Sequence, residues 1–188
     1  MIKDIVVKNR SYRRFHQESS IDIDTLKELV ELARFSGSGG NRQPLKYLLS
    51  CTKEKNALVF SCLAWAAYFK DWDGPVEGEK PSAYIILLGD TEISKSFAFD
   101  CGIVSQSILL GAVEKGLGGC MLASVDRDKL RSLLGITDRY EIPLVIALGK
   151  PKEKVVIETT GPDGDIKYWR DGEGVHHVPK RAMTDIIM

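Results

Sequence analysis

The chain has 188 residues, of which 44% are hydrophobic, and its 26 lysines and arginines equal its 26 aspartates and glutamates. A chain of this size buries one sizeable core, so we expect a single domain over residues 1–188. Zero net charge provides no global field toward nucleic acid or an acidic membrane, and no apolar run approaches the roughly 20 residues that span a bilayer. We therefore expect neither nucleic acid nor a membrane as a partner.

In the first half of the chain, helical patterns alternate with short apolar runs. Helices are predicted at residues 1–9, 22–35 and 57–69, and strands at residues 47–51 and 83–88. The clearest is the helix at 22–35, in which apolar residues recur at helical spacing after a capping residue at Asp24 or Thr25.

The second half continues this alternation up to Lys150. We predict helices at 100–115 and 126–134 and strands at 120–123 and 144–148. The helix at 100–115 is apolar on nearly every face, which is typical of a central helix packed on several sides. This order predicts a three-layer α+β or α/β domain. The polar, glycine-rich chain after Lys150 is long for an isolated loop, so it is either mobile or fastened, for example to another subunit.

The four cysteines, Cys51, Cys62, Cys101 and Cys120, form no CxxC pair and have no zinc-ligand spacing. They are typical of free, largely buried thiols in a reducing compartment. Residues 1–7 are too short and too charged for the apolar core of a secretory signal. Together these features predict a cytoplasmic protein.

Two basic clusters lie near the opposite ends of the chain, in residues 10–15 (Arg-Ser-Tyr-Arg-Arg-Phe) and 178–181 (Val-Pro-Lys-Arg). Taken singly, each is explained as a solvated face, with the arginines paired to Glu18, Asp22 or Asp24. Together they indicate one anion held from both ends, because a guanidinium can donate two parallel hydrogen bonds to a phosphate.

Two glycine-rich segments are further candidates. Residues 36–44 (Ser-Gly-Ser-Gly-Gly-Asn-Arg-Gln-Pro) would let a planar group approach the backbone, and the amides of Asn41 and Gln43 both donate and accept. Residues 116–124 lead from the central helix back into the core. A flexible loop and a tight connection, respectively, would also explain these segments. Neither matches a Rossmann or P-loop fingerprint.

Protein side chains offer little catalytic chemistry of their own. His176 and His177 would point apart on an extended segment and have no third ligand at suitable spacing, so we expect no metal site. Apolar neighbours favour an inert thiol at Cys120. Chemistry supplied by a cofactor is the remaining interpretation.

Four of these segments, in this order, resemble the motifs of the nitroreductase family of flavin mononucleotide (FMN) enzymes, and the resemblance covers essentially the whole chain. Residues 10–15 are similar to the family's Arg-Ser-x-Arg motif, and residues 38–44 to its Ser-x-x-Asn-x-Gln-Pro segment. Residues 100–124 are similar to its central helix and Gly-Leu-Gly turn, and residues 178–181 to its C-terminal Pro-Lys-Arg.

The resemblance implies an α+β fold, a three-layer sandwich whose central, mainly antiparallel sheet is flanked by helices. It also implies a homodimer that forms through long helices and exchanged termini, with the flavin at the interface. The implied flavin-binding residues, several of them from the partner chain or supporting its loop, are Arg10, Ser11, Arg13, Ser38, Gly39, Asn41, Gln43, Met121, Leu122, Ala123, Ser124, Lys180 and Arg181.

The implied activity is an FMN-dependent oxidoreductase that takes hydride from NADH or NADPH and reduces nitroaromatic, quinone or related conjugated acceptors by a ping-pong mechanism. Candidate walls for the acceptor are Trp65, Tyr68, Phe69 and Trp72, although ordinary packing would also explain each of them. The alternatives are dehalogenation, ene reduction or flavin fragmentation on the same cofactor, and a flavin-binding or storage protein without efficient turnover.

Two positions depart from the family pattern. Asn9 stands where many members have an arginine, so one phosphate contact is lost or moves to Arg14. Ala123 and Ser124 replace an acidic residue and a glycine of some members, which changes the polarity expected around the flavin ring.

Overall fold

The structure is a computed structural model that describes residues 1–188. Its centre is an antiparallel sheet in the order β1 (Leu45–Ser50), β2 (Ala83–Asp90), β5 (Val145–Gly149) and β3 (Gly118–Leu122), with β4 (Tyr140–Glu141) paired to the end of β2. The apolar runs that predicted β2 and β5 are buried along their whole length. Both strands are interior strands of the sheet, which explains why their sequences do not alternate with polar residues.

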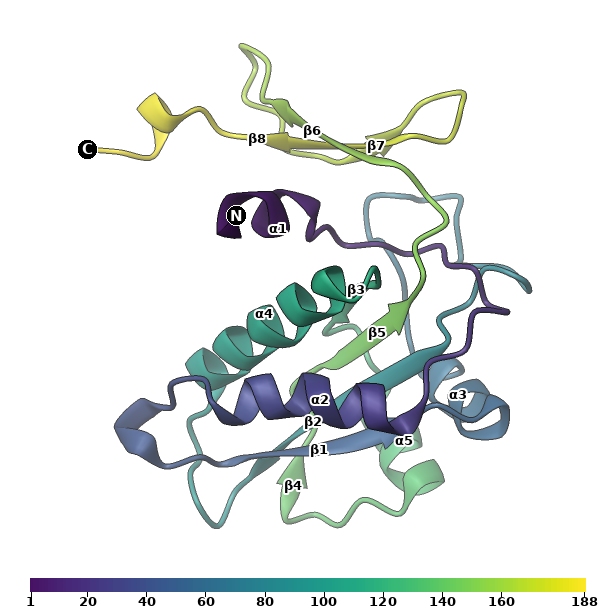
Figure 1. Ribbon diagram of the computed structural model, residues 1–188, viewed down its shortest axis with the longest axis vertical. Helices are drawn as coiled ribbons and strands as arrows, with labels where there is room; N and C mark the ends of the chain where they lie inside the picture. Colours follow the sequence, from purple (N-terminus) through teal and green to yellow (C-terminus); the bar gives the residue numbers. More distant parts are fainter.

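Helices cover both faces of this sheet (Figure 1). α2 (Ile23–Arg34) and α4 (Ala98–Glu114) pack on one face, and α3 (Lys53–Phe60) and α5 (Arg127–Leu134) on the other. Side chains of β2 alternate between the two layers: Ile85 packs with α2 and α4, whereas Ile86 packs with α3 and α5. This arrangement confirms the predicted three-layer α+β fold.

Local signals set the start of α2 and the turn that follows α4. α2 begins where the Asp22 carboxylate accepts a hydrogen bond from the Thr25 backbone N at 2.6 Å, so the capping residue is Asp22 and not Asp24 or Thr25. α4 ends at Glu114, and two residues later Gly116 turns the chain with a φ of +71°, which favours glycine. The chain then returns directly into β3.

The N-terminal basic cluster lies along the edge of the sheet. After α1 (Ile2–Lys8), the backbone N of Tyr12 donates to the carbonyl of Gly119 in β3 at 3.0 Å. A Cβ atom at Gly118 would come within 2.5 Å of the Tyr12 ring, so this close approach requires glycine. Phe15 is fully buried and fixes the far end of the segment. The glycines of the 116–124 segment therefore serve both the turn and the docking of the N-terminal segment.

The predicted helix at 57–69 is wrong beyond Phe60. α3 spans Lys53–Phe60, and residues 61–69 form turns and irregular chain with an isolated bridge at Leu63. Backbone bonds to the chain after β3 replace the helical ones: the N of Ala64 donates to the carbonyl of Ser124 at 3.0 Å, and the N of Asp126 donates to the carbonyl of Cys62 at 2.8 Å. Tertiary pairing overrides helix propensity here.

The chain after Lys150 is fastened and forms a second, small sheet. β6 (Val155–Thr159) pairs in parallel with β8 (His176–Lys180), and β7 (Trp169–Arg170) pairs antiparallel with β8. In Figure 1 this sheet lies above α1 and apart from the central sheet. Short 3-10 turns occur at Gly39–Asn41 and Met183–Asp185. None of the helices is long and apolar enough to cross a bilayer.

Candidate functional site

A cavity of about 530 Å³ opens between the N-terminal segment, α4, β3 and the small sheet. Its walls come from both ends of the chain and from the middle. The lining residues are Asn9, Arg10, Ser11, Arg13, Gln106, Leu109, Met121, Ile166, Tyr168, His176, Val178, Pro179, Lys180 and Arg181. The structure thus brings the two basic clusters together in one site.

Four cations line this cavity: Arg10, Arg13, Lys180 and Arg181. None of them forms an ion pair, whereas other arginines of the chain pair with carboxylates. No aspartate or glutamate is among the lining residues. The cavity is therefore a local concentration of positive charge in a chain of zero net charge, as an anion site requires.

The two N-terminal arginines of the cavity are held by backbone carbonyls. Arg10 donates to the carbonyl of Val6 at 2.8 Å, and Arg13 donates to the carbonyl of Ser11 at 3.1 Å. Burial lowers the pKa of Arg10. The Nε atoms of both guanidiniums are buried without any hydrogen-bond partner. Such orphaned charged donors are costly, so they fit a site that an anionic or polar ligand completes.

Arg14 points away from the cavity. Its guanidinium donates to both carboxylate oxygens of Glu79 at 2.6 Å and lowers the pKa of Glu79 to about 2. The alternative explanation, in which the cluster pairs with Glu18, Asp22 or Asp24, does not hold, since only Arg14 is paired and its partner is Glu79. Because Arg14 is engaged, it does not supply a contact in place of the arginine missing at Asn9. Asn9 itself is buried, and its amide donates to the Gln106 side chain at 3.4 Å.

The four predicted flavin-binding residues at positions 121–124 lie in different environments. Met121 lines the cavity and Leu122 is buried in the core below the sheet. Ala123 and Ser124 are exposed beyond the end of β3 and do not line the cavity. Cys120 is buried, and burial raises the pKa of its thiol, in agreement with the expected inert role.

The loop at residues 38–43 is fastened elsewhere, near the start of α4. The buried carboxylate of Asp100 accepts from the Ser38 hydroxyl at 2.5 Å and from the Gly39 backbone N at 3.0 Å. Asn41 and Gln43 have φ values of +53° and +51°, which are strained for residues other than glycine. Ser38 and Gln43 line a second hollow of about 180 Å³. Within one chain, the structure does not bring Ser38, Gly39, Asn41 or Gln43 to the cation-lined cavity.

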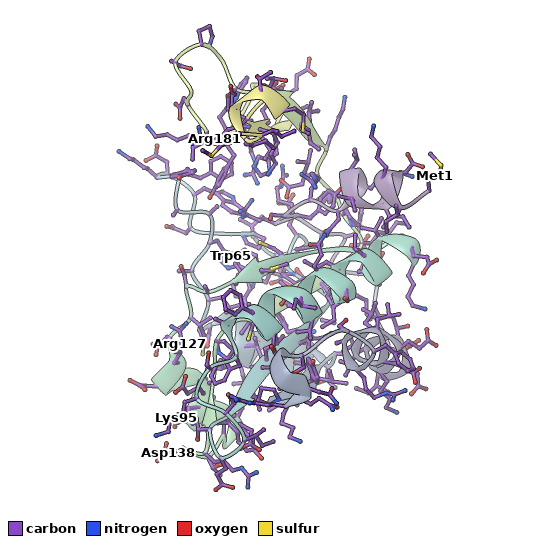
Figure 2. The ribbon with its side chains drawn as sticks, turned by 90° about the vertical axis from the view of Figure 1, so that its left-hand side faces the viewer. Met1, Trp65, Lys95, Arg127, Asp138 and Arg181 are labelled. Atoms are coloured by element: carbon purple, nitrogen blue, oxygen red, sulfur yellow. The ribbon has the colours of Figure 1, made fainter.

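The proposed aromatic walls do not line the cavity either. Trp65 is buried in the core on the side of the sheet that α3 and α5 cover, and Figure 2 shows it at mid-height of the molecule, below the Arg181 end. Tyr68 and Phe69 pack behind the cavity on Tyr168, with ring centroids 4.8 and 5.1 Å apart, respectively. Tyr168 is the aromatic residue that reaches the wall.

Sequence reasoning missed Tyr168, Ile166, Gln106 and the role of His176 as lining residues. His176, Val178 and Lys180 occupy alternate positions of β8, so a strand prediction at 176–180 would have placed His176 beside the Lys180 end of the site. The two histidines do point apart: His176 is buried at the cavity, and His177 stacks on Trp169 on the other side of the strand. No signal in the sequence identifies Tyr168.

The sequence model of the nitroreductase family matches residues 6–150. The chain belongs to the nitroreductase family. Its central sheet, the N-terminal segment and Met121 lie within the matched range, whereas Tyr168, His176, Lys180 and Arg181 lie beyond it. The family model therefore covers the part of the cavity wall formed by the N-terminal segment, α4 and β3, but not the part formed by the small sheet.

Several relatives agree with this assignment. A protein of Archaeoglobus fulgidus, provisionally named as an NADH dehydrogenase/NAD(P)H nitroreductase, is 24% identical over 157 residues, which are 79% of this chain and 85% of that protein. A nitroreductase family protein from Streptococcus pneumoniae TIGR4 superposes with a TM-score of 0.69 at 20% identity, covering 87% of this chain and 96% of that one. An FMN-dependent nitroreductase from Clostridium difficile R20291 superposes with a TM-score of 0.68 at 20% identity, covering 89% and 97%.

The residues of this nitroreductase-family chain fit the phosphate of FMN. The orphaned Nε atoms of Arg10 and Arg13 supply buried donors, and Lys180 and Arg181 supply two further cations at the end of β8. Met121 and Leu109 give the cavity an apolar side next to these charges. A charged end and an apolar wall in one cavity are the arrangement that a flavin nucleotide needs.

Proposed function

We propose that this chain is an FMN-dependent oxidoreductase that uses NADH or NADPH to reduce small conjugated acceptors such as nitroaromatics or quinones. The observation that carries the proposal is the cavity in which four unpaired cations meet an apolar wall on a nitroreductase fold. The names of the relatives from Archaeoglobus fulgidus and Clostridium difficile support the nicotinamide and the FMN, respectively.

The protein's own part in this reaction is binding and electrostatics. Bound FMN would supply the hydride chemistry, accepting from the nicotinamide and passing on to the acceptor in a ping-pong sequence. Arg10, Lys180 and Arg181 would hold the phosphate, with Ser11 as a further donor. Arg13, which is buried against Tyr168, would add a fourth positive charge beside this phosphate. No side chain needs to be covalently modified.

We further propose that the functional unit is a homodimer whose two sites each combine the cavity of one copy with the 38–43 loop of the other. α4 carries large exposed apolar side chains, with Phe99 85% and Ile103 44% exposed, which an interface would cover. Asp100 holds the strained loop next to this face. A second copy that packs on α4 would bring Ser38, Gly39, Asn41 and Gln43 toward a flavin that they do not reach within their own chain.

The proposal also includes a single domain and a cytoplasmic location. Residues 1–188 would act as one FMN-binding domain, because the chain that leads into the small sheet is bonded to the N-terminal segment: the N of Lys152 donates to the Arg14 carbonyl at 2.9 Å. All four cysteines are free, which supports a cytoplasmic location.

The decisive experiment is an absorbance spectrum of the purified protein followed by anaerobic titration with NADH and, separately, with NADPH. We expect a flavin spectrum that bleaches with one or both nicotinamides and returns when a nitroaromatic or quinone is added. A protein that neither contains nor binds FMN would refute the proposal. A protein that retains FMN but is reduced by neither nicotinamide would be a flavin-binding protein, and the enzymatic part would fail.

A further inference from the structure

His176 is a buried histidine whose ring has no partner in the cavity wall. Only 1% of the residue is exposed, and neither ring nitrogen forms a hydrogen bond. The Glu153 carboxylate lies 3.9 Å from Nδ1, but it already accepts from the Arg170 guanidinium at 2.9 Å and from the Arg13 backbone N. A buried polar ring without partners is costly, so its retention at a ligand cavity calls for a role.

The surroundings of His176 keep its ring neutral while the cavity holds no anion. Burial first, and then the positive charges of Arg13 and Arg170, lower the pKa of His176 to about 4. The rings of Phe69 and Tyr168 pack edge-on against the imidazole at 5.4 and 5.3 Å. The titratable and charged groups that face the ring come from the N-terminal segment, the chain before β6, and the small sheet. They are Arg13, Glu153, Tyr168, Arg170 and His177.

We propose that His176 takes up a proton when an anion binds among the four cations of the cavity, so that anion binding at this site is coupled to pH. An anion next to Arg13 cancels part of the positive field that disfavours the imidazolium. The proton comes from the buffer and stays on the imidazole, and no bond to the ligand is formed. The identification of the anion as the phosphate of FMN rests on the proposed function.

The sign of the coupling follows from linkage. If the ring binds a proton more tightly in the complex than in the free protein, lowering the pH favours the complex. We expect the pH dependence of anion binding to lie between the His176 pKa of about 4 in the free protein and the ordinary histidine pKa of 6.5. A ring that is about half to nine-tenths protonated in the complex at pH 5.5 would tighten binding about twofold to tenfold at that pH relative to a chain without the imidazole.

Nuclear magnetic resonance tests the proton directly because the chain has only three histidines, His16, His176 and His177. The imidazole signals are titrated in the flavin-free protein, with FMN, with inorganic phosphate, and with riboflavin, which has the same ring system without the phosphate. We expect the pKa of His176 to rise with FMN and with phosphate and to change little with riboflavin. An unchanged His176 pKa in the FMN complex would overturn the inference and leave FMN binding intact.

The binding experiment compares FMN dissociation constants at pH 7.5 and 5.5 for the wild type, His176→Gln and His16→Gln. His16 is a partly exposed histidine beside Glu18 and does not line the cavity, so it serves as the matched control. We expect the wild type and His16→Gln to gain about twofold to tenfold over His176→Gln at pH 5.5. Equal pH dependence in all three proteins would refute the coupling.

The outcomes also separate this inference from the proposed function. If FMN does not bind but inorganic phosphate raises the His176 pKa, the flavin proposal fails and the coupling stands. If neither ligand binds, both fail. Should His176→Gln not fold, the titration of the wild-type ring still decides the question.

Discussion

The guanidinium carbon of Arg13 lies 4.8 Å from the centroid of the Tyr168 ring. The aromatic face covers one side of the cation, while the buried Nε of Arg13 remains without a partner. This contact joins the N-terminal segment to the small sheet at the cavity, so the same arginine contributes to both the walls and the charge of the site.

Arg13 and Arg14 are adjacent, but we expect their replacement to affect different properties: FMN binding for Arg13 and thermal stability for Arg14. Arg13→Ala should weaken FMN binding about tenfold to a hundredfold, because hydrogen bonds to charged groups contribute about 1.5–3 kcal/mol. Arg14→Ala should leave FMN binding nearly unchanged and lower the midpoint of thermal unfolding, because it leaves the Glu79 carboxylate with Lys152, at 3.2 Å, as its remaining cation. Fluorescence titration with FMN measures the first effect and calorimetry the second. A greater loss of FMN in Arg14→Ala would contradict the site.

Lys180→Ala should also weaken FMN binding, because it removes one of the four cations. Lys95→Ala is its control: Lys95 lies at the opposite end of the molecule from the Arg181 end of the site, as Figure 2 shows. FMN binding that is unchanged in Lys180→Ala would remove the small sheet from the proposed phosphate site.

The shared site predicts complementation between two defective chains. One chain carries Arg13→Ala and Lys180→Ala, and the other carries Asn41→Ala and Gln43→Ala. Each homodimer should retain little FMN, whereas the heterodimer should recover one intact site of its two. Co-expression with two affinity tags and measurement of flavin per purified heterodimer tests this. If each loop instead serves its own chain, no intact site forms and no FMN is recovered.

Acid should destabilise the protein partly through Glu79. Its pKa is lowered to about 2 from an ordinary 4.5, mainly by the hydrogen bonds from Arg14. A lowered pKa stabilises the fold above the unfolded value, and this contribution is lost as the pH falls from about 4.5 to about 2. Urea unfolding at several pH values should therefore show a shallower acid loss in Glu79→Gln than in the wild type. Parallel curves would contradict the assignment.

Protonated His177 should stabilise the small sheet. Its ring bonds to Glu158 of β6 and to Asp171 beyond β7, and these bonds raise the pKa of His177. A raised pKa gives a contribution that is fully present below the ordinary value of 6.5 and is lost as the pH rises through the folded value. Amide hydrogen exchange, corrected for its intrinsic pH dependence, should show weaker protection of residues 155–180 at alkaline pH. His177→Gln should remove this pH dependence.

Gly118→Val should undock the N-terminal segment, because a Cβ atom would come within 2.5 Å of Tyr12. Overpacking of this kind costs about 1–3 kcal/mol, and we expect loss of FMN as well, since Arg10 and Arg13 flank Tyr12. Gly172→Ala is the control, because nothing lies within 4 Å of its Cβ position. Denaturant unfolding and FMN titration measure both effects, and a stable variant that retains FMN would show that this docking is dispensable.

The sequence predicted the layered fold because the decisive signals are local. The apolar runs of β2 and β5 and the periodicity of α2 identify core elements without any long-range information. α3 was extended too far because the bonds that replace its last turns come from residues 124–126. The small sheet escaped prediction because β7 has two residues and the segment is polar.

The charged residues of the site could be predicted from the sequence, but the residues that line the cavity through tertiary packing could not. Arginines beside a serine stand out in a sequence, and so do Lys180 and Arg181. Tyr168 reaches the cavity only because Tyr68 and Phe69 support its ring from a turn that the sequence suggested was a helix. The pKa of His176 is lowered by Arg13 and Arg170, and Arg13 comes from the opposite end of the chain.

The cavity needs residues 9–13 and residues 176–181 at the same time. During synthesis on the ribosome the arginines emerge early, and the edge of β3 that receives them follows later. The second half of the anion site leaves the exit tunnel only with β8, the last strand of the small sheet. Capture of the proposed cofactor would therefore belong to the final stage of maturation, and a stalled chain that ends before β8 would carry a folded central sheet without an assembled anion site.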